Sequence, residues 1–229
     1  MLERHDDIAN WSEAAQIFEL DYFNPEISHD KDIYDVTPLE VFRLYMYFGI
    51  YTRLKRKTRF LNKHPQNSLR IPYLKAIFPD AQFIHVIRDA RAVVRSHLAQ
   101  VRRDRYRQSI PFGSFPKPPR WREYLSLTAL EQYAHQWVDL ILAIRECSTE
   151  VLGSEDYLEV RYEDFCTDSH GELRRIDQFC GLDPSKRRYA SIPERFVVRN
   201  DQWRHDFSSS DLKVIEEVTG PLMKELKYI

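Results

Sequence analysis

An arginine and a serine eight residues apart are the first side chains in this sequence whose types and spacing suggest chemistry. Arg88 follows a run of strand-forming residues, Phe83 to Ile87, and helix-competent residues come directly after it. In an open α/β sheet, ligands bind where a strand ends and its helix begins, and Ser96 would lie about two turns into that helix. A guanidinium and a hydroxyl that converge on one point suit a phosphate group. The alternative is a buried strand whose arginine pairs with a carboxylate and whose serine faces solvent.

Three motifs in the chain together resemble a known family. They are Asn62-Lys63-His64-Pro65, the group Arg88, Asp89, Arg91 and Ser96, and Tyr162-Glu163-Asp164. This combination resembles the sulfotransferases that use 3′-phosphoadenosine-5′-phosphosulfate (PAPS), particularly the bacterial and protein-tyrosine branches. The resemblance covers about residues 60–229. In that family the residues matched by Arg88 and Ser96 bind the 3′-phosphate of the nucleotide, so the resemblance implies PAPS as the co-substrate.

Lys63 and His64 are the candidate catalytic residues. In the family, a lysine at the end of a short strand contacts the transferring sulfuryl group, and Lys63 occupies that position in the motif. A fixed ammonium there would stabilise the charge that develops on the bridging oxygen as it leaves. His64 has the pKa range of a general base. However, Pro65 should hold His64 extended, and neighbouring side chains of an extended segment point to opposite faces, which argues against His64 if Lys63 faces the sulfate.

Three further residues match positions that lie near the nucleotide in the family. Tyr162 matches a tyrosine near the adenine, although a tyrosine at a strand end is also common in simple packing. Trp203 and Arg204 match a closing loop that folds over the nucleotide. The family usually has glycine and a basic residue just before that tryptophan, whereas this chain has Asp201 and Gln202. This difference weakens the expectation that the loop contacts phosphate.

The pattern of the chain predicts a single α/β domain over residues 1–229, with a mainly parallel sheet flanked by helices. Thr37, Pro38 and Glu40 form a capping box that should start a helix running to about Arg56. The other elements that the pattern predicts are a helix over 11–20, a strand over 60–63, a helix over 67–78, the strand 83–87 with a helix to about 106, a helix over 125–147, a strand over 157–162, a helix over 173–180, and a last helix capped by Ser208 or Ser210. Residues 108–120, with four prolines, should be a lid or acceptor wall, or else disordered.

Composition gives no sign of a polyanionic or membrane partner. There are 34 Lys plus Arg against 35 Asp plus Glu, and no stretch is long and apolar enough to span a membrane, so we expect a cytoplasmic protein. The three cysteines have neither disulfide-framework nor metal-ligand spacing. Seven arginines between Arg88 and Arg107 could in principle bind RNA, but no aromatic platform or RNA motif accompanies them. We therefore expect no nucleic-acid partner and no metal, since protein cations can neutralise the developing charge.

One part of the family pattern is missing from this sequence. The family begins with a strand and a phosphate loop that binds the 5′-phosphosulfate, and none of the six glycines here sits in such a loop. The fold expected is thus similar to that of P-loop nucleotide kinases without their first strand and loop. In the family this strand lies beside the one that ends at Arg88, so we expect the chain as given to be truncated or degenerate, poorly soluble and inactive in transfer.

The function that the resemblance implies is transfer of a sulfuryl group from PAPS to a hydroxyl or amine of a small molecule, glycan or peptide. The alternative is a relative without catalysis that binds a nucleotide or a partner.

Overall fold

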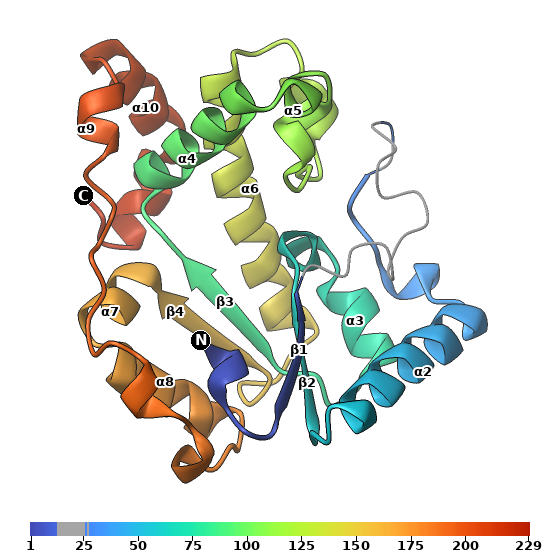
Figure 1. Cartoon of the computed structure of the whole chain (residues 1–229). Helices are drawn as coiled ribbons and strands as arrows, with labels where there is room; N and C mark the ends of the chain where they lie inside the picture. Colours follow the sequence, from blue (N-terminus) through green and yellow to red (C-terminus); the bar gives the residue numbers. More distant parts are fainter. Residues whose placement is uncertain (13–25, 27) are drawn as a thin grey trace.

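Two pairs of parallel strands, with helices around them, make up the described part of the chain. The computed structural model has 229 residues, and its described residues are 1–12, 26 and 28–229. β1 (Ile8–Ser12) pairs with β2 (Arg59–Lys63), and β3 (Phe83–Ile87) pairs with β4 (Tyr157–Arg161). The carboxyl ends of both pairs point toward the same end of the molecule (Figure 1). An α/β fold with parallel strands flanked by helices is confirmed, but the described strands form two separate pairs instead of one sheet.

The first pair of strands is covered by α2 (Pro38–Leu54). Thr37 caps this helix, and it exchanges hydrogen bonds with Glu40 in the predicted capping box. Phe48 on the inner face of α2 stacks on Phe60 of β2, with the ring centroids 4.1 Å apart. Leu44 and Phe48 also contact α3 (Ile71–Ile77) in one apolar cluster. The capping signal therefore located the start of α2 correctly, and the periodic apolar residues located its buried face.

The second pair of strands is held by three long helices. They are α4 (Ala90–Arg103), α6 (Ala129–Glu150) and α10 (Ser209–Glu225), and capping boxes start α6 at Thr128 and α10 at Ser208. Ile87, the last residue of β3, is buried against Trp137 of α6 and Met223 of α10. Because the strand end lies in this apolar cluster, the position of Arg88 directly after it is fixed by the core.

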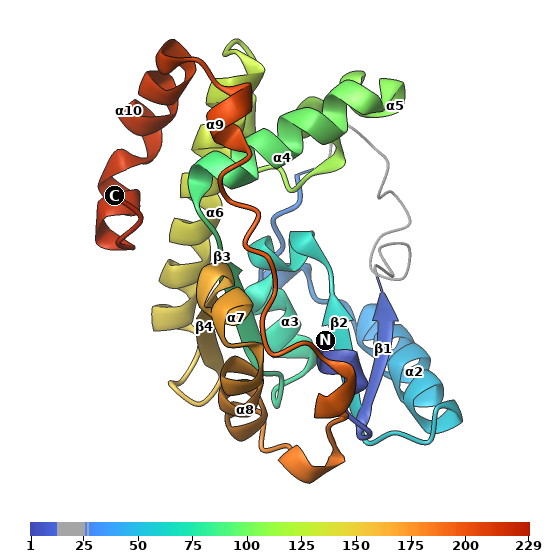
Figure 2. The same ribbon diagram turned by 60° about the vertical axis from the view of Figure 1, so that its left-hand side comes forward.

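Short elements connect these parts. The α-helices are α5 (Arg105–Gln108), α7 (Tyr162–Thr167), α8 (Ser169–Phe179) and α9 (Trp203–Asp206). The 3-10 helices are η1 (Leu2–Arg4), η2 (Ile33–Asp35), η3 (Pro65–Leu69), η4 (Pro111–Ser114), η5 (Trp121–Tyr124), η6 (Pro184–Lys186) and η7 (Tyr189–Ser191). Figure 2 shows the segment before α9 running past α7 toward α4. This path brings residues near position 200 to the end of β3.

Several predicted elements differ in the structure. Trp11 and Ser12 belong to β1, so the helix predicted over 11–20 is wrong there, and its remaining positions lie outside the described residues. The helix predicted over 67–78 begins only at Ile71, since Pro72 fits the first turn of a helix and not its interior. The helix predicted to run from β3 to about 106 ends at Arg103, where Asp104 caps the separate α5.

The proline-rich segment 108–120 is packed into the molecule. Phe112 is only 2% exposed and belongs to the cluster formed by α4, α6 and α10. Phe115 stacks on His97 of α4, with centroids 3.8 Å apart, and Lys117 is buried. These contacts contradict the expectation of disorder, and they place the aromatic side chains of the segment in the core and not over a site.

Candidate functional site

A cavity of about 230 Å³ lies where β3 and β4 end. Three segments line it, namely the end of β3 with α4, the start of α7, and the segment before α9; the lining residues are Arg88, Ala92, Arg95, Ser96, Tyr162, Arg199, Asn200, Gln202 and Trp203. Three of these residues are arginines, and among the described residues no carboxylate lines the cavity. The arrangement favours an anion of small size.

Arg88 is oriented by neutral groups. Its carbonyl oxygen accepts a hydrogen bond of 2.9 Å from the indole nitrogen of Trp137. Its guanidinium lies 4.4 Å from the ring centroid of Tyr162, while Nε donates to Asn200 Oδ1 over 2.9 Å and Nη2 donates to the carbonyl oxygen of Arg199 over 2.7 Å. Within the described part of the chain Arg88 forms no ion pair, so its charge is not neutralised by a carboxylate and Nη1 is left to bind an anion.

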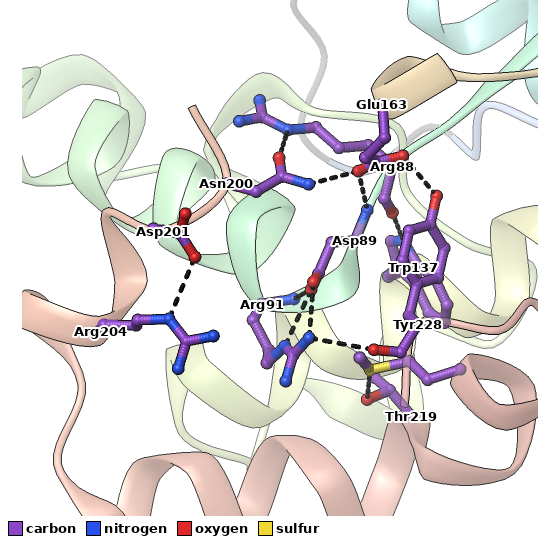
Figure 3. A network of polar contacts seen from close by, with 11 residues as sticks. Arg88, Asp89, Arg91, Trp137, Glu163, Asn200, Asp201, Arg204, Thr219 and Tyr228 are labelled. Carbon is purple, nitrogen blue, oxygen red and sulfur yellow. Dashed lines mark hydrogen bonds and ion pairs between the residues drawn. The ribbon is translucent and has the colours of Figure 1, made fainter. Parts of the chain in front are cut away.

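Glu163 organises the residues that hold Arg88. Its carboxylate accepts hydrogen bonds from the backbone nitrogen of Asp89 at 3.2 Å, from the hydroxyl of Tyr228 at 2.9 Å, and from the amide nitrogen of Asn200 (Figure 3). Burial and the adjacent Glu163 carboxylate raise the pKa of Tyr228, so this hydroxyl remains a donor at neutral pH. Glu163 thereby fixes Asn200, and Asn200 in turn fixes the guanidinium of Arg88.

Ser96 and Arg95 both reach the cavity from α4. The hydroxyl oxygen of Ser96 accepts a hydrogen bond of 3.4 Å from Gln100, which leaves its own proton available to a ligand. Arg95 was not predicted as a site residue. Its Nε lies 2.6 Å from Asp206 Oδ2, and its Nη1 donates to Gln202 Oε1 over 2.8 Å. Its place next to Ser96 in the predicted helix was the signal that could have identified it.

Trp203 and Arg204 lie differently from the expectation. Trp203 lines the cavity but is only 5% exposed. The guanidinium groups of Arg91 and Arg204 both lie over its ring, each 4.5 Å from the centroid. Arg204 does not line the cavity, and its Nε pairs with Asp201 at 3.0 Å on the surface. Asp201 and Gln202 stand where the family usually has glycine and a basic residue, and the Asp201 carboxylate is the group that pairs with Arg204.

Tyr162 lies at the start of α7, where β4 ends. Its ring faces Arg88, and burial raises the pKa of its hydroxyl. The structure thus brings together Arg88, Ser96, Tyr162 and Trp203 out of the five residues expected at the nucleotide.

Lys63 and His64 do not line this cavity. Lys63 ends β2 and is exposed, whereas His64 is 7% exposed. His64 has φ −141° and ψ 124°, the extended conformation expected before Pro65, and this conformation turns the two side chains to opposite sides. Burial lowers the pKa of His29 to about 3, and the neighbouring charges of Lys117, Arg70 and, last, His64 act in the same direction.

Neither a metal site nor a membrane span stands out in the described ranges. In residues 1–12, 26 and 28–229, no three His, Cys, Asp or Glu side chains come together in a way that could hold a metal ion. In the same residues no helix has both the length and the apolar character needed to cross a bilayer.

Comparison with known proteins gives consistent matches. The model of the family described as "Sulfotransferase family" matches residues 3–186. The omega-hydroxy-beta-dihydromenaquinone-9 sulfotransferase Stf3 of Mycobacterium bovis is 28% identical over 165 residues, which cover 69% of this chain and 38% of that protein. The protein-tyrosine sulfotransferase A of Caenorhabditis elegans is 27% identical over 128 residues, covering 56% of this chain and 28% of that protein.

A solved structure also matches. The sulfotransferase domain from the Synechococcus PCC 7002 olefin synthase has a TM-score of 0.45 and 20% identity, covering 76% of this chain and 63% of that domain. The matched region corresponds to less than two fifths of the length of the two curated relatives named above.

Proposed function

The chain belongs to the sulfotransferase family, and from this premise we propose that the cavity at the end of β3 binds the 3′-phosphate of PAPS in a sulfuryl-transfer reaction. The observation that carries the proposal is the convergence of Arg88, Ser96 and Arg95 on one cavity that no described carboxylate lines. A phosphate placed there would accept charge-assisted hydrogen bonds from the guanidinium groups and a neutral bond from the hydroxyl. The charge-assisted bonds contribute about 1.5–3 kcal/mol each, and the neutral bond about 0.5–1.5 kcal/mol.

The other predicted nucleotide residues receive narrower roles. Tyr162 supports Arg88 by stacking with it, and it lines the cavity in which the 3′-phosphate is proposed to bind. Trp203 holds the segment before α9 against α4 through Arg91, so its contribution to binding is to keep that wall of the cavity closed. Arg204 is not assigned a phosphate contact, because it does not line the cavity and pairs with Asp201 on the surface.

Lys63 is proposed to contact the transferring group. It stands at the carboxyl end of β2, and this end points to the same side of the molecule as the end of β3 (Figure 1). An exposed ammonium at that edge would stabilise charge on the bridging oxygen as the S–O bond to phosphate breaks. His64 is not proposed as the base, because it is buried away from that edge.

The acceptor is proposed to be a hydroxyl. The two curated relatives carry names that specify an omega-hydroxy menaquinone and a protein tyrosine, and both of these present hydroxyl groups. An attacking hydroxyl oxygen would form the new O–S bond while the phosphate oxygen leaves, and the hydroxyl proton would pass to a base or to solvent. PAPS is the only co-substrate that this reaction needs.

Equilibrium dialysis with radiolabelled PAPS tests the proposal. The wild-type chain should retain the label, and Ser96→Ala should weaken binding by about three- to tenfold, as expected for loss of one neutral hydrogen bond. Gln100→Ala is a matched control, because it removes only the neighbour of Ser96. If the wild-type chain bound no PAPS, or if Ser96→Ala bound it unchanged, the assignment of this cavity would be wrong.

A further inference from the structure

α2 carries apolar side chains on the face that points away from the molecule. Its inner face is already used, since Leu44 and Phe48 pack on α3 and β2. Along the other side, large apolar residues recur every three or four positions and are 44–78% exposed; these residues, the α2 stripe, are Leu39, Phe42, Met46, Ile50 and Leu54. Helices that are apolar on both sides are ordinarily buried on both sides. A row of large, exposed apolar side chains of this kind favours an interaction site.

The two ends of the α2 stripe carry opposite charges. Asp32 and Asp35 are exposed just before the helix begins. Arg53, Lys55 and Arg56 are exposed where it ends. Figure 1 shows α2 at the edge of the molecule, on the opposite side from α4, whose residues Ala92, Arg95 and Ser96 line the cavity. The stripe is therefore separate from the proposed nucleotide site.

We propose that the α2 stripe is the interface of a homodimer in which α2 packs antiparallel to α2 of a second copy. Met46 is the middle residue of the helix, so a two-fold axis beside it would pair Phe42 of one copy with Ile50 of the other. The same axis places the acidic start of each helix beside the basic end of its partner. The helix dipoles are then also opposed, which is the favourable arrangement.

A membrane surface fits the same features less well. An anionic bilayer would attract the basic end of α2 but repel Asp32 and Asp35 at the other end. In the antiparallel homodimer, by contrast, both charged ends of α2 lie beside the opposite charge on the second copy. The stripe, the two charged ends and the central position of Met46 thus favour a copy of this chain as the partner.

Disulfide trapping tests the dimer and its register. Under mild oxidation Met46→Cys should form a cross-linked dimer, since the two positions meet at the axis. Phe42→Cys should not cross-link with itself, because its two copies lie about 12 Å apart along an antiparallel pair. A mixture of Phe42→Cys and Ile50→Cys should cross-link. Leu142→Cys, at an exposed position on α6, and the unmodified chain with its own three cysteines are the controls.

Equal cross-linking of Phe42→Cys, Met46→Cys and Ile50→Cys with themselves would indicate a parallel pair and overturn the antiparallel arrangement. No cross-linking of Met46→Cys above the controls would also overturn it. These variants keep the charge of the surface, so they report on the interface even if more drastic changes affect folding.

Sedimentation velocity tests the role of charge. The wild-type chain should be dimeric at about 10–100 μM. Phe42→Glu should raise the dissociation constant of the dimer by at least about tenfold, whereas Leu142→Glu should leave it unchanged. Chains carrying Arg53→Glu with Lys55→Glu, or Asp32→Lys with Asp35→Lys, should each be monomeric, and mixing the two should restore a dimer. A monomeric wild-type chain, or one that binds vesicles of an anionic phospholipid through Phe42 while remaining monomeric in solution, would contradict the proposal.

Discussion

Arg88 and Asn200 are joined by a hydrogen bond of 2.9 Å between Nε and Oδ1, although they lie 112 positions apart in the chain. The bond links the end of β3 to the segment that runs back past α7. Since the amide nitrogen of Asn200 donates to Glu163, the orientation of the Arg88 guanidinium depends on a carboxylate that does not touch it. The anion site is therefore built from three distant parts of the chain.

Replacing Glu163 should weaken nucleotide binding without removing any residue that lines the cavity. Glu163→Gln keeps the size of the side chain but removes its charge and turns one acceptor oxygen into a donor, so the hydrogen bonds that orient Asn200 and Tyr228 become weaker. We expect adenosine 3′,5′-bisphosphate to bind about three- to tenfold more weakly, the equivalent of about 1 kcal/mol. Tyr228→Phe, which removes one donor and leaves Asn200 in place, should have a smaller effect. Calorimetry showing wild-type affinity for Glu163→Gln would remove Glu163 from this role.

Lys63 should matter for turnover and not for binding of the product nucleotide. Its proposed contact is with the transferring sulfuryl group, which adenosine 3′,5′-bisphosphate lacks. Lys63→Ala should therefore bind this nucleotide within about twofold of the wild-type chain. In a version that carries the family's phosphate loop and is active in transfer, Lys63→Ala should lower kcat far more than it raises KM. Lys55→Ala, which removes another exposed lysine, is the matched control. An unchanged kcat would make Lys63 a surface residue.

The ion pair between Asp177 and Arg187 should contribute strongly to stability. Both side chains have no exposure, and Arg187 also donates to the carbonyl oxygen of Met1 over 3.2 Å. Asp177→Ala leaves a buried cation without its carboxylate, which typically costs about 3–5 kcal/mol. Arg188→Ala, which breaks the exposed pair with Asp6, should cost less than about 1 kcal/mol. In urea unfolding, the loss in the free energy of unfolding should be several-fold larger for Asp177→Ala than for Arg188→Ala. Similar losses for the two variants would contradict the argument from burial.

Stability should fall as the pH drops from about 6.5 to about 4 because His97 is buried in its neutral form. Burial lowers the pKa of His97 to about 4, whereas in the unfolded chain it would be near 6.5. In this window the unfolded state binds more protons, so the free energy of unfolding decreases by about 1.4 kcal/mol per pH unit from this residue. His97→Gln should flatten this dependence, and the exposed His205→Gln should not. An equal pH slope for wild-type and His97→Gln chains would show that His97 is not the source.

Local signals in the sequence predicted the elements that carry the site. The strand-forming run before Arg88 is β3, and the capping residues Thr37 and Ser208 begin α2 and α10 where expected. These predictions hold because each depends on neighbours within a few positions. The strand β1 was missed because, of its five residues, only Ile8 and Trp11 are strong strand formers, and because its partner β2 lies some fifty positions later.

The partners within the site could not be predicted in the same way. Asn200 acts through contacts between distant segments, and no local pattern marks it. Glu163 lies in the motif Tyr162-Glu163-Asp164, but nothing in that motif indicates that its carboxylate holds Asn200. The arginine at 204 matched a motif by its type, but its surface pairing with Asp201 decides where it points. Phe112 and Phe115 looked like lid residues because of the prolines around them, and burial against α4 and α6 reverses that interpretation.

The most direct test compares two nucleotides that differ only in the 3′-phosphate. We expect calorimetry to show that the wild-type chain binds adenosine 3′,5′-bisphosphate at least about tenfold more tightly than adenosine 5′-monophosphate. Arg88→Ala should abolish most of this preference while leaving the weaker affinity for the monophosphate nearly unchanged, and Arg204→Ala, which removes an arginine outside the cavity, should retain the preference. Equal affinity of the wild-type chain for the two nucleotides would contradict the assignment of Arg88, Ser96 and their cavity to the 3′-phosphate.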